Sequence, residues 1–169
     1  NNFPDVLYSD ERVIDERGEC LSGPFHKPSW SKYMHLSMNY TTHLTLYSLD
    51  LVRKVGGFRQ GFEGAQDHDL MLRATEATKK PVVHVPFILY QWRAHQGSTA
   101  LGMGEKSYAA IAGEKCIKEA LIRRGLDGEV SYENNTAHYR VKYSLPKNSP
   151  LISIIIPSKN SVHYLKKCI

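Results

Sequence analysis

Cysteine and long apolar runs are scarce in this sequence, and each shortage excludes a class of protein. The three cysteines, Cys20, Cys116 and Cys168, stand far apart. Their spacing fits neither a disulfide framework nor a zinc site, so the chain suits a reducing compartment. No uncharged apolar run approaches the roughly 18 to 20 residues that span a bilayer, and the N-terminus lacks a basic-then-apolar signal pattern. We therefore expect a soluble, cytoplasmic protein.

Positive charge is in excess, but only modestly. The formal net charge is +5, and it is spread along the chain in pairs such as Lys79-Lys80 and Arg123-Arg124. A basic balance suits an anionic partner, such as a nucleotide diphosphate, a lipid phosphate or a membrane surface. Nucleic-acid binding requires a denser basic stripe with interleaved aromatic residues, so no nucleic-acid partner is expected.

The stretch from Gly56 to Arg73 is rich in glycine and acidic residues. Its glycines are typical of a loop that adopts positive φ and lies close to a ligand. Apolar periodicity then predicts a helix from Asp67 to Lys79. An aspartate at a helix start can be an N-cap or a partner of the helix dipole. It can also be a carboxylate held in front of a substrate, and the pattern alone leaves these alternatives open. Arg73 lies off the stripe of Asp67 and is expected to support the loop.

This stretch resembles the Gly-Gly-Phe…Gly-Ala-Gln-Asp-Tyr-Asp-Leu-x-Leu-Arg signature of the family-2 inverting glycosyltransferases of bacterial surface-polysaccharide synthesis. His68 stands where the signature has Tyr. The resemblance implies that Asp67 is the general base that deprotonates the acceptor hydroxyl.

The stretch 25–31 resembles the Phe-Lys-Pro-Asp-Trp-Ser segment that precedes the acceptor side of the pocket in these enzymes. Trp30 can stack on a sugar ring, but a core aromatic is an equally good interpretation. Together the matches imply four acceptor-binding residues: Trp30, Asn39, Gly64 and Gln66.

The stretch 5–11 reads as a short buried strand that runs into an acidic turn. Carboxylates at a strand end of an α/β sheet lie where such sheets bind ligands, and they suit Mg²⁺ or Mn²⁺. The stretch resembles the Tyr-Ser-Asp-Glu-Asp segment that carries the family's metal-binding Asp-x-Asp motif, although Arg12 stands where a second Asp is common. Asp10 is the first candidate for a metal ligand and Glu11 is the second. An acidic turn without a metal is the alternative.

Two strands are expected at 82–86, closed by Pro86, and at 87–93. The sequence from His84 to Ala100 resembles the family's His-x-Pro…Leu-Tyr-x-Trp-Arg-x-His-x-Gly-Ser-Thr-Ala closing segment. The resemblance implies that His95 completes the metal's ligand set. It also implies contacts to the donor diphosphate from Arg93, Ser98 and Thr99.

The remaining patterns predict further elements of an α/β protein. Residues 12–30 read as a loop and 38–47 as strand-like. The expected helices are 49–55, capped by Ser48 and stopped by Gly56, and 104–124, stopped by Gly125. A β-hairpin is expected from strands at 130–133 and 138–145. After a linker, residues 151–157 read as a strand buried on both faces.

Together with the resemblance, these patterns imply a partial GT-A (Rossmann-like) α/β fold, with a mixed sheet and flanking helices followed by a helix and a hairpin. Residues 1–100 match the acceptor- and metal-side half of one transferase domain, 101–150 match the connector, and 151–169 match the first strand and helix start of a second domain. The apolar strand is expected to add to a vacant sheet edge, within its own chain or as a swapped dimer.

The expected activity is that of a fragment of a hexosyltransferase-type enzyme. In the parent protein it transfers a sugar with inversion from a nucleotide-diphosphate sugar to a glycan or lipid-linked acceptor, assisted by Mn²⁺ or Mg²⁺. Peripheral association with the inner face of the cytoplasmic membrane fits such an acceptor. The fragment alone is expected to be inactive. The alternative is a non-catalytic binding or scaffold module with a degenerate GT-A fold.

Overall fold

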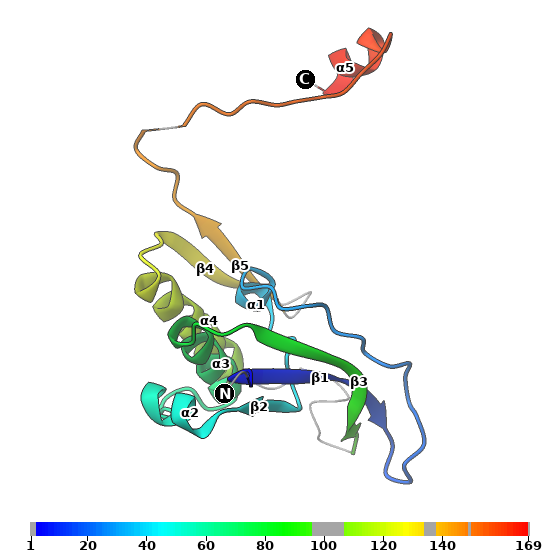
Figure 1. Ribbon diagram of the computed structural model, residues 1–169, viewed down its shortest axis with the longest axis vertical. Helices are drawn as coiled ribbons and strands as arrows, with labels where there is room; N and C mark the ends of the chain where they lie inside the picture. The colour runs from blue at the N-terminus through cyan, green and yellow to red at the C-terminus, as the bar shows by residue number, and fades with distance from the viewer. Residues whose placement is uncertain (1–2, 96–106, 134–137, 149, 169) are drawn as a thin grey trace.

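A computed structural model describes residues 3–95, 107–133, 138–148 and 150–168 (Figure 1). The elements in chain order are β1 (Val6–Ile14), α1 (Met34–Ser37), β2 (Thr45–Tyr47), α2 (Leu49–Val55), α3 (Gln66–Ala77), β3 (Val82–Arg93), α4 (Ser107–Arg123), β4 (Gly128–Glu133), β5 (His138–Tyr143) and α5 (Val162–Cys168). The expected α/β class is confirmed.

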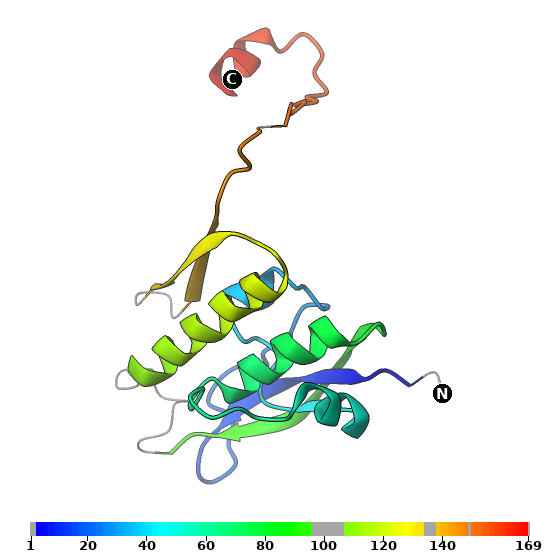
Figure 2. The ribbon, with the colours of Figure 1, turned by 90° about the vertical axis from the view of Figure 1, so that its left-hand side faces the viewer.

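The centre of the fold is a three-stranded mixed sheet in the order β2-β1-β3. β1 pairs antiparallel with β2 and parallel with β3. Helix α3 lies between this sheet and α4 (Figure 2). It buries apolar side chains on two faces. Met71 joins Val6 in the core cluster beneath the sheet, whereas Leu72 joins Ile117 of α4 in a second cluster. Burying each such side chain contributes roughly 1.5 to 3 kcal/mol, so α3 is held from both sides.

Two strands differ from their expected extents. β1 continues to Ile14, so Asp10 and Glu11 lie inside a strand and the expected acidic turn is wrong. β3 is one strand that runs through Pro86, rather than two. The pairing of β1 with β3 shifts register on either side of Asp10. Such a bulge accommodates a proline, which has no N–H to give to the ladder.

Of residues 38–47, which have a strand-like pattern, only Thr45–Tyr47 form a strand, β2. Local bonds form at the start of β2 and before it: the Thr42 hydroxyl donates to the Asn39 carbonyl at 3.3 Å, and the Thr45 hydroxyl donates to the Thr41 carbonyl at 2.7 Å. Threonine hydroxyls that bond nearby backbone compete with strand pairing. The loop at 12–30 is also partly bridged to β1, through Glu11–Phe25 and Ile14–Cys20.

The helix boundaries largely follow the sequence. The Ser48 side chain caps α2 and Gly56, in the left-handed region, ends it, as predicted. The N-cap of α3 is Ala65 without a side-chain bond, so Asp67 is not an N-cap. The described part of the long helix and both hairpin strands agree with prediction. Gly113 lets the hairpin dock on α4, because a methyl group there would overlap the Tyr139 hydroxyl.

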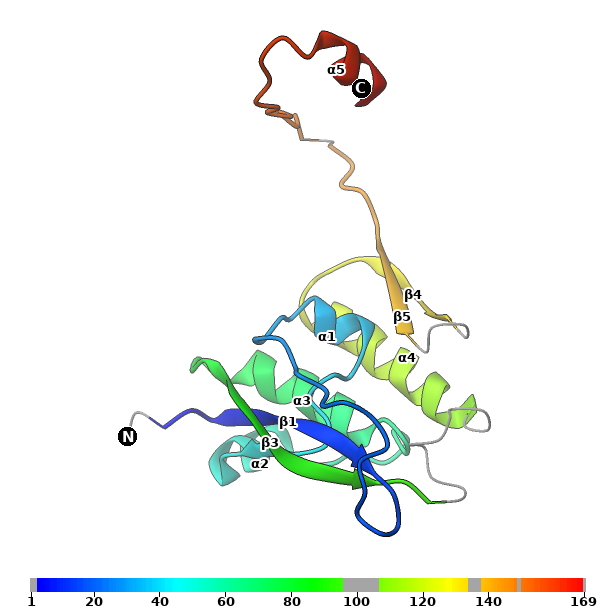
Figure 3. The same ribbon diagram turned by 90° about the vertical axis from the view of Figure 1, so that its right-hand side faces the viewer.

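The apolar stretch from Leu151 to Ile156 forms no strand and is exposed. It extends away from the sheet toward α5 (Figures 1 and 3). The expectation that it adds to the sheet of its own chain is therefore wrong, because β5 directs the chain away from that sheet. The swapped dimer stays a prediction. Among the described residues, no helix is both long and apolar enough to cross a membrane.

Candidate functional site

Asp67 lines a small pocket that carries several polar side chains. Helix α3 begins at Gln66, which places the half-buried Asp67 in its first turn. The pocket in front has a volume of about 150 Å³ and is lined by Asn39, Thr41, Thr42, His43, Thr45, Tyr47, Phe58, Asp67 and Leu70. The structure thus brings together two predicted site residues, Asp67 and Asn39. It adds four hydroxyl groups and one imidazole, from Thr41, Thr42, Thr45, Tyr47 and His43.

Position 64, in the loop before Asp67, requires glycine. Its φ is +83°, and a Cβ there would lie 2.7 Å from Cβ of Ala109 in α4. A side chain would therefore be both strained and too close to the helix. The Gly64 N–H donates to the Gln66 side chain at 2.8 Å. Both residues line a neighbouring pocket of about 330 Å³, which shares Phe58 with the first.

Asp69, two residues after Asp67, is fully buried between two arginines. Arg59 and Arg73 each donate two hydrogen bonds to its carboxylate. Burial opposes ionisation, but these bonds outweigh it and hold the pKa of Asp69 below its ordinary value. Arg73 also donates to the carbonyls of Val55 and Gly57, at 2.6 Å each. The predicted supporting role of Arg73 agrees with these contacts.

Asp10 is 1% exposed, and both of its oxygens are engaged. It accepts from His26 Nδ1 at 2.8 Å, from the Lys27 backbone N–H at 3.0 Å and from His84 Nε2 at 2.6 Å. Burial would raise the pKa of Asp10, but these bonds lower it to about 2. The carboxylate is therefore a charged structural centre that joins β1, β3 and the loop at 26–27.

Glu11 is engaged on the other face of β1. Its Oε2 accepts from the His43 backbone N–H at 2.6 Å, from His43 Nδ1 at 2.9 Å and from Lys27 Nζ at 3.3 Å. Burial opposes ionisation of Glu11, but the His43 bond and the Lys27 charge hold its pKa below the ordinary value. Lys27 Nζ, which is itself buried, also donates to the Thr42 carbonyl.

The predicted metal ligands do not fit a divalent ion as they are arranged. Such ions require carboxylate oxygens that point to a common centre, whereas those of Asp10 and Glu11 accept bonds from neighbouring N–H groups. Within the described ranges, no three His, Cys, Asp or Glu side chains form a group that could hold a metal. His95 lies beyond Arg93, the partner of Ile14, and Ile14 is roughly 13 Å along β1 from Asp10. The structure therefore does not bring His95 to Asp10.

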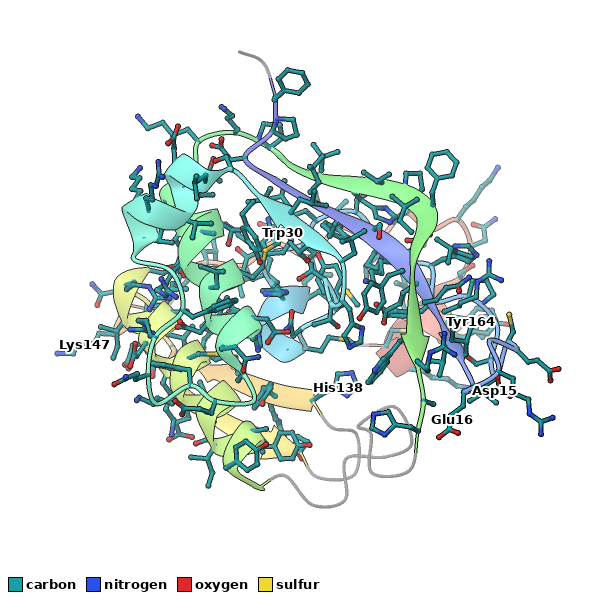
Figure 4. The ribbon with its side chains drawn as sticks, turned by 90° about the horizontal axis from the view of Figure 1, so that it is seen from below. Asp15, Glu16, Trp30, His138, Lys147 and Tyr164 are labelled. Atoms are coloured by element: carbon teal, nitrogen blue, oxygen red, sulfur yellow. The ribbon has the colours of Figure 1, made fainter. Side chains whose placement is uncertain are left out.

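The predicted diphosphate contacts are not assembled at Asp10 either. Arg93 donates to the backbone carbonyls of Asp15 and Glu16, at 3.0 and 2.7 Å. These two residues lie at the far end of β1 (Figure 4). Ser98 and Thr99 lie outside the described residues.

Trp30 packs in the interior and lines neither pocket (Figure 4). Its ring lies 5.1 Å from that of His35 and 6.1 Å from that of Tyr40. This placement favours the core interpretation over stacking on a sugar.

Sequence reasoning missed the histidines that bond to Asp10 and Glu11. His26, His43 and His84 were not assigned, although Thr41-Thr42-His43 visibly interrupts the strand-like alternation before β2. The histidines lie 16, 32 and 74 residues from their carboxylate partners. No local pattern reports contacts over such separations.

No family model matches the chain. Among curated proteins, the chain is 37% identical over 163 residues to the uncharacterized protein y4gI of Sinorhizobium fredii (strain NBRC 101917 / NGR234), a match that covers 95% of this chain and 18% of that protein. It is 37% identical over 161 residues to the O-antigen biosynthesis protein RfbC of Myxococcus xanthus, covering 95% and 12%. It is 20% identical over 156 residues to the hyaluronan synthase of Pasteurella multocida, covering 86% and 16%. The chain thus spans less than a fifth of the length of each of these relatives.

Proposed function

We propose that the chain is part of a glycosyltransferase whose base is Asp67. The observation that carries the proposal is the half-buried Asp67 in the lining of a pocket that also carries hydroxyl groups. Support comes from the 37% identity to an O-antigen biosynthesis protein over 95% of the chain. The weaker similarity to a hyaluronan synthase points to the same class of chemistry.

The proposed reaction is hexosyl transfer from a nucleotide-diphosphate sugar to a glycan or lipid-linked acceptor with inversion. The acceptor hydroxyl gives its proton to Asp67 while its oxygen bonds to the anomeric carbon and the bond to the diphosphate breaks. Asp67 Oδ1 accepts the His68 backbone N–H at 2.8 Å, which orients the carboxylate. Oδ2 makes no bond to any described residue and is the atom proposed to take the proton.

Mn²⁺ or Mg²⁺ stays a prediction for the donor side, where it would offset the charge of the leaving diphosphate. Asp10 and Glu11 do not fit the ion as they are arranged, so no step here depends on it.

We further propose the domain assignment of the family-2 resemblance. Residues 1–100 would be the acceptor-side half of a GT-A domain, 101–150 a connector and 151–169 the start of a second domain. Two features support it: the central sheet has three strands, and the exposed run at 151–156 is apolar enough to require a sheet of its own. The 169-residue chain alone would then have no turnover, because the contacts that position a donor are incomplete.

The second candidate is a binding or scaffold module that keeps the fold without catalysis. The internal pairing of Asp10 and Glu11 favours it, because both carboxylates accept bonds from neighbouring N–H groups.

The full-length protein tests both candidates. It would be incubated with a panel of nucleotide-diphosphate sugars and oligosaccharide acceptors, and products would be identified by mass spectrometry and by the anomeric NMR coupling of the new linkage. We expect a glycoside of inverted configuration. Calorimetric absence of donor binding, together with absence of product, would favour the scaffold.

A further inference from the structure

His43 is a second polar side chain in the Asp67 pocket. We propose that Glu11 and His43 form a carboxylate–imidazole pair in which His43 Nε2 accepts a hydrogen bond from a hydroxyl of a neutral sugar bound in that pocket. The inference rests on the proposed function, which it deepens by naming a ligand class and a residue that selects it.

The pair has the geometry that fixes a histidine tautomer. Glu11 Oε2 accepts both the His43 backbone N–H, at 2.6 Å, and ring Nδ1, at 2.9 Å. A carboxylate only accepts, so a ring proton lies on Nδ1, and in the neutral ring Nε2 then carries the lone pair. Lys27 Nζ also contacts Glu11 Oε2, at 3.3 Å. Within the described chain, no group bonds to Nε2.

Two aromatic residues of β3 pack against the imidazole ring of His43 and fix its orientation. Tyr90 stacks on the His43 ring at 5.2 Å with an interplanar angle of 13°, and Trp92 lies at 4.1 Å and 46°. Their strand positions pair with Glu11 and Val13 of β1. The His43 side chain is 28% exposed, and it lines the pocket together with Asp67. The ring is thus held before a ligand arrives, which lowers the entropy lost on binding.

The rest of the pocket selects a neutral polyhydroxyl compound. Thr45 and Thr42 donate their hydroxyl protons to backbone carbonyls, so their oxygens remain acceptors for a ligand's hydroxyl groups. Phe58 is 67% exposed and offers an apolar face for the C–H side of a sugar ring. The carboxylate of Asp67 disfavours an anion, so the pocket suits a sugar ring better than a phosphate.

Binding to the 169-residue chain provides a test that does not depend on activity. The histidine ring nitrogens would be followed by ¹⁵N NMR during titration with a panel of methyl hexopyranosides and, separately, with inorganic phosphate. We expect the Nδ1–H tautomer of His43 in the free chain, and a saturable shift of Nε2 with at least one hexopyranoside but not with phosphate. His26, which pairs with the neighbouring Asp10 and is outside the pocket, provides the internal control and should not shift. The opposite tautomer of His43, or a response to phosphate alone, would overturn the proposal.

Kinetics of the full-length protein separate this inference from the proposed function. His43→Phe should raise the KM for the acceptor about tenfold with kcat nearly unchanged, because one neutral hydrogen bond to the ligand is lost. His43→Gln, which keeps a side-chain acceptor, should recover part of the loss, and Asp50→Asn, at a side chain that is 99% exposed, should change neither constant. Transfer with an unchanged KM in correctly folded His43→Phe, judged by its melting temperature, would refute the role of His43 and leave the proposed function standing. No transfer by wild type, together with the hexopyranoside shift of Nε2, would refute the function and leave the pair standing.

Discussion

The chain has two acidic pairs, Asp10–Glu11 in β1 and Asp67–Asp69 at the start of α3. The two pairs differ in the contacts that their carboxylates make. In β1 both carboxylates are engaged by N–H groups of histidine and lysine residues. In α3 one carboxylate is buried between arginines, whereas the other faces a pocket. A carboxylate with several internal partners maintains the fold, and one with few is available for a ligand. By this criterion Asp67 is the only one of the four carboxylates that is available for chemistry.

Replacement of Asp69 should have the largest effect on stability. Asp69→Asn leaves Arg59 and Arg73 without their buried counter-charge, which costs roughly 3 to 5 kcal/mol of unfolding free energy. Urea denaturation of the 169-residue chain measures it. Asp50→Asn is the matched control, because the Asp50 side chain is 99% exposed. A loss below about 1 kcal/mol would show that the arginine contacts do not stabilise the fold.

Replacement of Asp10 should have a smaller effect that depends on pH. Its folded pKa of about 2 lies below the unfolded value, so its stabilisation is present above about pH 4 and is lost as the pH falls toward 2. Asp10→Asn should therefore cost about 2 to 3 kcal/mol at pH 7 and much less near pH 2. Urea denaturation midpoints at the two pH values measure the difference. An equal loss at both would contradict the ionised network.

The buried ring of His35, which packs against His68 of α3, should make the fold sensitive to mild acid. Its ring is fully buried, lacks a hydrogen-bond partner and lies 4.7 Å from the ring of His68. Burial lowers its folded pKa well below the ordinary value, with His68 and Arg124 acting in the same direction. The unfolded chain then binds the extra proton below about pH 6.5, so stability falls as the pH drops from there. His35→Phe should reduce this loss between pH 7 and 5 by about 2 kcal/mol in urea denaturation. If the unfolding free energy of His35→Phe fell between pH 7 and 5 as much as that of wild type, His35 would not be the source of the acid sensitivity.

Divalent metal should have almost no effect on the chain without nucleotide. If the folded chain had a metal site, a free metal concentration of a hundred times the dissociation constant would raise the unfolding free energy by about 2.7 kcal/mol. Because Asp10 and Glu11 are internally paired, we expect the melting temperature in Mn²⁺ to match that in EDTA. A clear rise that disappears in Asp10→Asn would show that the β1 pair opens to bind metal after all.

Prediction from sequence succeeded where contacts are local and failed where they are distant. Ser48 and Gly56 bound α2 as expected, because caps depend on residues within one turn. The end of β1 and the continuity of β3 through Pro86 were missed, since their pairing and its bulge depend on residues more than 70 positions apart. At the site, Asp67 and Asn39 line one pocket, whereas the position of His43 beside them could be seen only in the fold. The apolar run at 151–156 has a strand-like pattern, but no strand partner is present for it within the described chain.

The most direct test of the account is the turnover number of Asp67→Asn in the full-length protein, measured as nucleoside diphosphate released in the presence of acceptor. Asparagine keeps the shape and the His68 contact but cannot take a proton, so we predict a fall of about 100-fold or more with an unchanged melting temperature. Asp50→Asn should retain wild-type turnover. Turnover of Asp67→Asn within a fewfold of wild type would contradict the assignment of Asp67 as the base.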